Sequence, residues 1–184
     1  MQTSDFPPDF QGVKNAVLTA PEEETLVQFY RKFSSKDDIT NVVRDSSEPN
    51  LVDEDAILTL ACEKIQKRRL GRGIANLSES YVAFIRGALA RLGITIWCPN
   101  LSQNRDDLYN VACQIVAVTT FQQISVAGAY DYMSLNHLYL MQSSLLQKAY
   151  DHFVHYVMKA KFNREKQVNG SLQMEAQKKV WSKN

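Results

Sequence analysis

A long apolar stretch in the second half of the chain limits the folds that this sequence can adopt. From about residue 106 to residue 129, apolar side chains fall on nearly every side of a predicted helix, and they include Leu108, Ile115 and Ile124. A helix without a polar face must be covered by other elements. The sequence therefore predicts a central helix around which the remaining elements pack.

Apolar residues spaced three and four apart predict further helices on both sides of this stretch. They follow capping or acidic residues, such as Glu22–Glu24, Asp53 and Ser78, and Gly93 favours an end of the helix that starts at Ser78. The expected helices cover approximately residues 21–33, 39–43, 53–70, 78–92, 134–168 and 171–181. Almost no segment has the alternation that predicts a strand.

The predicted helix at 134–168 carries two apolar seams. Leu146, Ala149, Phe153, Tyr156 and Ala160 form the first seam, and Tyr150, Val154 and Val157 form the second. Steps of three and four residues are typical of a helix face that packs against a neighbour. We therefore expect this helix to contact other elements on two sides.

The predicted fold is all-α, with a single compact domain of six to seven helices. A chain of 184 residues is long enough for one hydrophobic core. The core domain is expected at residues 21–168, between an extended N-terminal arm at 1–20 and a C-terminal helical arm at 169–184. The Pro7-Pro8 pair favours an extended arm.

Charge is sorted along the chain although the formal net charge is only +1. Residues 1–63 carry thirteen acids and five bases, whereas residues 64–73 carry five bases and no acid. Residues 144–184 carry eight bases and three acids. Such a layout is typical of a protein that binds a polyanion with one part and a partner with another.

The basic run is the strongest functional candidate. Five cations in nine residues can follow a phosphate backbone without reading its sequence. We expect nearby arginines and one from the turn after Pro99 to join it, with Tyr81 and Tyr109 as candidate stacking partners for bases. The predicted nucleic-acid-binding residues are Lys64, Lys67, Arg68, Arg69, Arg72, Arg86, Arg91 and Arg105. The alternative is a solvated helix end, and a nuclear-localisation signal is a third interpretation.

The two ends of the chain are candidates for self-association. Two phenylalanines could dock the N-terminal arm on a neighbour, and opposite charges could join the first helix to the last one head-to-tail. The predicted self-association residues are Phe6, Phe10, Glu22, Glu23, Glu24, Lys159, Lys161, Arg164 and Lys166. The second basic block could also serve as a further strip for the polyanion.

The sequence contains no catalytic motif. His152 and His155 lie three residues apart beside Asp151, but a third metal ligand at suitable spacing is missing. No Gly-rich phosphate loop and no nucleophile elbow is present. We therefore expect neither an enzyme nor a metal or cofactor site, and an enzyme that uses these two histidines is the third-ranked hypothesis.

The layout resembles the helical nucleocapsid and coat proteins of RNA viruses. The similarity rests on an arm before an acidic first helix, a helix that ends in a basic run, an apolar central helix, and the segment His137-Leu-Tyr-Leu-Met-Gln142, which is similar to one in bunyavirus-type nucleoproteins. The resemblance implies binding of single-stranded RNA, independent of sequence, and a homo-oligomer joined by terminal arms. No membrane partner is expected, because no apolar run is long enough to span a bilayer.

These expectations amount to a non-enzymatic, self-assembling RNA-binding protein. It would be located in the cytoplasm, or in the virion if viral, with a nuclear location as a further option. The alternative is a cellular all-helical adaptor that binds another protein in a groove between helices and binds no nucleic acid.

Overall fold

The computed structural model describes residues 20–58, 69–70, 73–74 and 77–168. Within them the fold is all-α, as predicted, apart from one two-stranded β-hairpin. The predicted helix at 171–181, the whole C-terminal arm and residues 1–19 of the N-terminal arm lie outside the described residues. No helix of the described part is long and apolar enough to cross a membrane.

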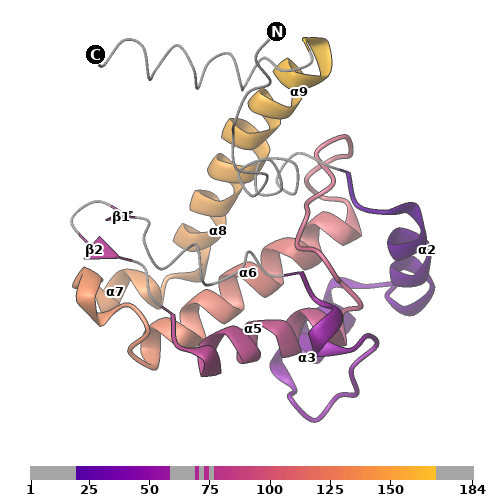
Figure 1. Cartoon of the computed structure of the whole chain (residues 1–184). Coiled ribbons are helices and arrows are strands. Elements are labelled where there is room, and N and C mark those ends of the chain that lie inside the picture. The colour runs from indigo at the N-terminus through magenta and orange to yellow at the C-terminus, as the bar shows by residue number, and fades with distance from the viewer. Residues whose placement is uncertain (1–19, 59–68, 71–72, 75–76, 169–184) are drawn as a thin grey trace, which may run out of the picture.

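The central helix is α6 (Leu108–Val126), which crosses the middle of the molecule (Figure 1). It contacts α2 (Glu23–Lys32), α3 (Lys36–Arg44), α5 (Glu79–Arg91), α7 (His137–Leu140) and α8 (Ser143–Asp151). Tyr109, Ala112 and Cys113 have no exposed surface. The prediction of a buried central helix is therefore confirmed.

The first two helices cover one side of α6 because their apolar residues recur at helical spacing. Phe29 of α2 lies edge-on to Tyr109, with 5.3 Å between ring centroids. Ile39 and Val43 of α3 are buried in the same core. A capping box starts α3, in which Ser35 Oγ accepts from the backbone N–H of Asp38 and the Asp38 carboxylate accepts from the backbone N–H of Ser35.

The prediction of a helix that starts at Asp53 is wrong for its first residues. Asp53 does cap the next residues, but only one 3₁₀ turn, η1 (Glu54–Ala56), follows it. The backbone N–H of Leu58 then donates to the carbonyl of Thr95 at 2.8 Å, so it makes no helical hydrogen bond. Contact with a distant segment overrides the local pattern. The expected continuation at 59–68 lies outside the described residues.

The basic run ends in a hairpin. Strand β1 (Arg69–Leu70) pairs antiparallel with β2 (Gly73–Ile74), in the register Arg69↔Ile74 and Leu70↔Gly73. The prediction that a helix extends to residue 70 is therefore wrong at its last two residues. Only Gly71 and Arg72 separate the two strands in the sequence.

Helix α5 ends where the sequence predicts. Gly93 follows it with φ +69°, a left-handed conformation that glycine adopts without a Cβ clash. A Cβ at this position would also lie 3.4 Å from Cδ1 of Leu51. The backbone N–H of Leu51 donates to the carbonyl of Ala90, which holds the 50–58 segment against the end of α5.

The segment predicted as one helix at 134–168 is divided. Ser134 has φ +50° after the 3₁₀ turn η2 (Asp131–Met133), and the short helix α7 precedes the break at Gln142. A continuous helix then begins with α8, winds as the π-helical segment η3 (His152–Met158) and ends with α9 (Lys159–Gln167). Figure 1 shows α9 rising away from the bundle around α6.

Only one of the two predicted seams on this helix faces the core. Val154 and Met158 are buried with Leu101, and Trp97, Tyr150 and Phe162 pack against them. In the other seam, Phe153 is 57 % exposed and Tyr156 is 69 % exposed. The prediction that both seams contact other elements is therefore wrong among the described residues. Spacing alone does not tell which seam meets the 97–101 loop.

Candidate nucleic-acid interface

The predicted basic site is only partly within the described residues. Lys64, Lys67, Arg68 and Arg72 lie outside them. Arg69 starts β1 and pairs with Ile74 across the hairpin. The structure thus gives the backbone position of one member of the basic run, at a hairpin and not at a helix end.

Arg91 is buried and cannot contact a phosphate backbone in this structure. It is 6 % exposed, its Nε donates to the carbonyl of Val42 at 3.1 Å, and its Nη2 donates to the carbonyl of Val43 at 3.4 Å. These carbonyls belong to the last residues of α3, where helical partners are lacking. The prediction that Arg91 binds nucleic acid is therefore corrected, because its guanidinium joins α5 to α3.

The two candidate stacking partners, Tyr109 and Tyr81, have different surroundings. Tyr109 is fully buried, so its assignment as a stacking partner is wrong. Tyr81 is half-buried, and its hydroxyl donates to the carbonyl of Ala127 at 2.6 Å. Arg86 lies one turn further along α5 and pairs with Glu79 at 3.6 Å, with 29 % of its side chain exposed.

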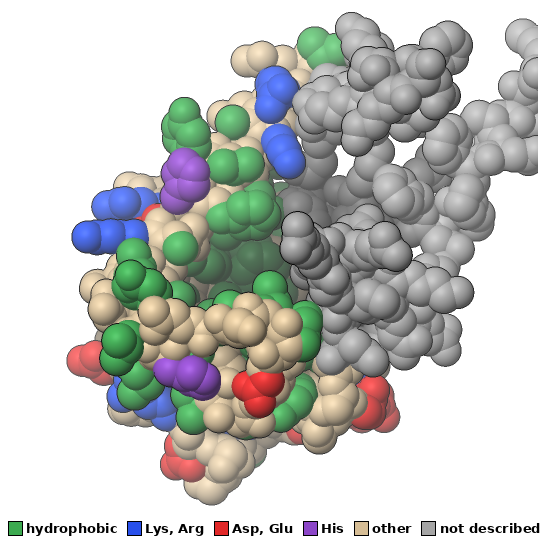
Figure 2. Space-filling view, turned by 90° about the vertical axis from the view of Figure 1, so that its left-hand side faces the viewer, with side chains coloured by type: hydrophobic (Ala, Val, Ile, Leu, Met, Phe, Trp, Pro, Cys, Tyr) green, Lys and Arg blue, Asp and Glu red, His purple; other side chains and the backbone are tan. Residues whose placement is uncertain are grey.

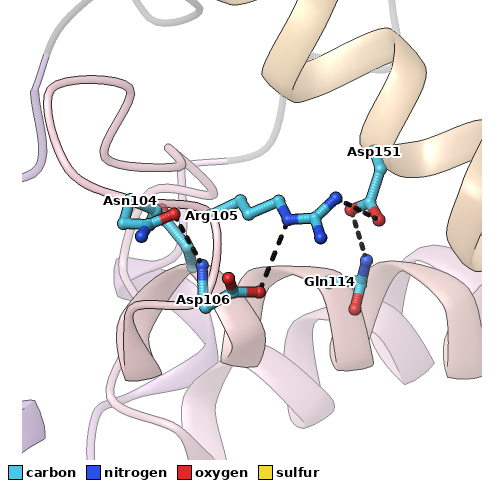
Figure 3. Close-up of polar contacts among 6 residues, drawn as sticks. Asn104, Arg105, Asp106, Gln114 and Asp151 are labelled. Carbon is cyan, nitrogen blue, oxygen red and sulfur yellow. Dashed lines mark hydrogen bonds and ion pairs between the residues drawn. The ribbon is translucent and has the colours of Figure 1, made fainter.

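Among the predicted cations whose side chains the structure describes, Arg105 is more exposed than Arg86 and Arg91. It lies in the loop before α6, and Figure 3 shows its guanidinium between two carboxylates. Its Nε is 3.5 Å from Asp106 Oδ1, and its Nη1 is 3.9 Å from Asp151 Oδ2, with 60 % of the side chain exposed. Ion pairs this open are worth at most about 1 kcal/mol, so the guanidinium can exchange partners readily.

Further contacts surround Arg105, and they come from α6 and from the continuous helix formed by α8, η3 and α9, which we call the long helix. Gln114 Nε2 donates to Asp151 Oδ1 at 2.7 Å. Lys159 Nζ donates to the carbonyl of Gln103 at 3.3 Å. The Gln114 contact joins α6 to α8, and the Lys159 contact joins α9 to the loop that carries Arg105.

His152 and His155 have different surroundings. The ring of His152 is exposed and stacks on Tyr156, with 5.3 Å between centroids. His155 is half-buried, its ring centroid is 6.0 Å from that of Tyr150, and its inaccessible Nδ1 has no hydrogen-bond partner among the described residues. No group of three metal-ligating side chains occurs in the described part of the chain.

The predicted self-association residues lie on separate elements. Glu22, Glu23 and Glu24 are exposed at the first turn of α2, while Phe6 and Phe10 lie outside the described residues. The four cations of the second basic block lie on α9. Lys161, Arg164 and Lys166 are exposed and Lys159 is half-buried.

Sequence reasoning missed the polar contacts that position the 100–107 loop. Asn110 and Gln114 lie on α6 among apolar residues, and both side chains bond to groups outside that helix. A polar side chain inside an otherwise apolar helix is a signal for such a contact, because a buried amide needs hydrogen-bond partners.

No protein-family model, curated protein or solved structure matches this chain. The function must therefore be inferred from the residues themselves.

Proposed function

We propose that this chain is a non-enzymatic, self-assembling protein that binds single-stranded RNA through its phosphate backbone, without sequence preference. The observation that carries the proposal is the basic run at residues 64–73, which has five bases and no acid. Each phosphate that such a run neutralises releases counterions, which supplies most of the affinity for a polyanion of any sequence.

Two described features support this function. Arg105 is exposed and held only by weak ion pairs, so it can turn to a phosphate at little cost. Helix α9 carries four bases against Glu165, and it projects from the bundle (Figure 1). Its cations point in several directions around the helix, which suits non-directional attraction to a flexible polyanion better than readout of bases.

The alternative function is a helical protein-interaction adaptor that binds no RNA. Exposed apolar side chains at α7 favour it, since Leu138 is 75 % exposed, Tyr139 56 % and Met141 73 %. Large exposed apolar patches mark protein–protein contact sites in many soluble proteins.

The first test measures the ratio of absorbance at 260 nm to that at 280 nm for freshly purified protein, before and after a high-salt wash, together with the mobility shift of a labelled RNA. The full chain is expected to retain nucleic acid at low salt and to lose it at high salt. Replacing Lys67, Arg68, Arg69 and Arg72 together by Gln is expected to reduce RNA affinity at least about tenfold, because each lost phosphate contact removes counterion release.

A matched control removes four positive charges elsewhere. Arg31, Lys32, Lys36 and Arg44 are exposed on α2 and α3, and their replacement by Gln changes the net charge equally. This control variant is expected to retain most of the RNA affinity. Equal losses in both variants would mean that only net charge matters, and nucleic-acid-free wild-type protein without any RNA shift would rule out the proposal.

A further inference from the structure

The outer face of the long helix carries an apolar seam with no partner among the described residues. We call the residues Leu145, Ala149, Phe153, Tyr156 and Ala160 the outer seam. Leu145, Phe153 and Tyr156 are 42 %, 57 % and 69 % exposed, and both alanines are exposed. Steps of three and four residues mark one face of an α-helix. Phe153 and Tyr156 lie in the π-helical segment η3, and their exposure places both on the open side of the helix.

The opposite face of the same helix explains why the outer seam stays open. Val154 and Met158 are already buried against Leu101, and Trp97 meets Tyr150 edge-on at 6.2 Å between ring centroids. The helix is therefore fixed to the domain by its inner face. The outer seam is not needed for that attachment. Its contact with water is unfavourable, and burial against another helix would remove this cost.

The exposed area is close to what one partner contributes to a standard interface. With side-chain areas of about 150–250 Å² for large residues, the three large side chains of the outer seam expose roughly 350 Å² per copy. Leu138, Tyr139 and Met141, at the α7 end of this helix, add about 400 Å² on the same basis. The total approaches the about 800 Å² that each partner contributes to a standard interface. Figure 2 faces the side of the molecule on which α7 lies in Figure 1, and it shows hydrophobic side chains among polar and charged ones on the described surface.

Charge decides the direction in which two such helices would pair. The α9 end carries Lys161, Arg164 and Lys166, whereas α8 carries only Lys148 and Asp151. A parallel pair would bring two basic ends together, which costs energy. An antiparallel pair places the two basic α9 ends at opposite ends of the interface. The α9 end of each copy then lies over α7 of the partner, where long basic side chains can cover apolar surface.

We propose that the outer seam is a self-association surface, on which the long helices of two copies pair antiparallel around a two-fold axis. In the register that sets the large Phe153 against a small residue, Ala149 faces the partner's Phe153, and Leu145 lies near the partner's Tyr156. Phe153 then lies near the centre of the interface, where aromatic side chains contribute most. The surface serves the self-assembly part of the proposed function, and it does not require RNA.

The test uses the full chain, freed of nucleic acid by nuclease and high salt, so that RNA cannot bridge copies. Sedimentation at tens of micromolar protein is expected to show a dimer. Phe153→Glu is expected to weaken dimerisation at least about tenfold, because a charge replaces a buried aromatic side chain. Val27→Glu, at a 45 % exposed position on α2, is the matched control and is expected to leave the dimer intact.

Cross-linking tests the direction of pairing. Cysteines are introduced singly in a Cys62→Ser background, since Cys98 and Cys113 are buried. In the proposed register the two copies of Ala149→Cys lie about 6 Å apart along the helix axis, whereas those of Ala160→Cys lie more than about 20 Å apart. A short bismaleimide is therefore expected to join Ala149→Cys and not Ala160→Cys.

Three results would overturn the proposal. A monomeric wild-type protein would mean that the outer seam is covered by residues 1–19, by residues 169–184 or by another protein, and not by a second copy. A dimer that survives Phe153→Glu would place the interface elsewhere, and cross-linking of Ala160→Cys would make the pair parallel. If Phe153→Glu does not fold, as judged by circular dichroism, Tyr156→Glu at the most exposed seam position serves the same test.

Discussion

The His155 imidazole lies half-buried against the ring of Tyr150, and charges from two elements surround it. Burial lowers its pKa, the carboxylates of Asp151 and Asp106 oppose this effect, and Lys159 and Arg105 add to it. Its inaccessible Nδ1 has no hydrogen-bond partner in the described part of the chain that could stabilise the charged form. The neutral imidazole is thus the form that the folded protein favours.

This lowered pKa predicts a pH dependence of stability. The unfolded chain, with an ordinary histidine pKa near about 6.5, binds the proton more tightly than the folded protein does. The free energy of unfolding is therefore expected to fall as the pH decreases from 7 to 5. His155→Gln should flatten this slope in urea unfolding, whereas His152→Gln should retain it because His155 is still present. A slope unchanged by His155→Gln would contradict the assignment.

At the level of elements, the start of α6 holds the loop that carries Arg105. Asn110 has no exposed surface, and its amide exchanges two hydrogen bonds with the backbone of Asn100. It also donates to the carbonyl of Asn104 at 2.7 Å. The side chain of Asn110 therefore fixes the loop at Asn100 and at Asn104 against the central helix. The position of Arg105 depends on this anchor and on its ion pairs.

Asn110→Ala is expected to lower the free energy of unfolding by at least about 2 kcal/mol, because the buried backbone N–H and carbonyl of Asn100 lose their partner and the carbonyl of Asn104 loses a hydrogen bond. The exposed Asn41 of α3 gives the control, and Asn41→Ala is expected to change stability by less than about 0.5 kcal/mol. Urea unfolding followed by circular dichroism measures both values. Equal stabilities for the two variants would show that the loop does not depend on the Asn110 amide.

At the level of the whole molecule, the features that could be predicted from the sequence are those that depend on interactions between residues close together in the chain. Helix α6 was predictable because an all-apolar helix can only be central, and the end of α5 was predictable because Gly93 tolerates a left-handed backbone. The all-α class follows from these local signals.

Features that depend on distant contacts were not predictable. The Asp53 cap is real, yet the pairing of Leu58 with Thr95 prevents a helix there. Spacing identified two seams on the long helix but not which one meets the core. The number and positions of charged residues in the sequence likewise did not show that Arg91 is buried and joins α3 to α5 whereas Arg105 is exposed.

Salt should separate the two kinds of assembly that this molecule is expected to form. RNA binding depends on counterion release, so its affinity should fall steeply as salt rises. Pairing through the outer seam buries apolar side chains, and salt does not weaken that contribution. In a titration with a labelled single strand, the slope of log affinity against log salt should decrease by up to about 3 when the four cations of the basic run are replaced. The dimer should persist over the same salt range in sedimentation. If the dimer dissociates along with the RNA, self-association depends on charge or on RNA bridging, and the outer seam is not its basis.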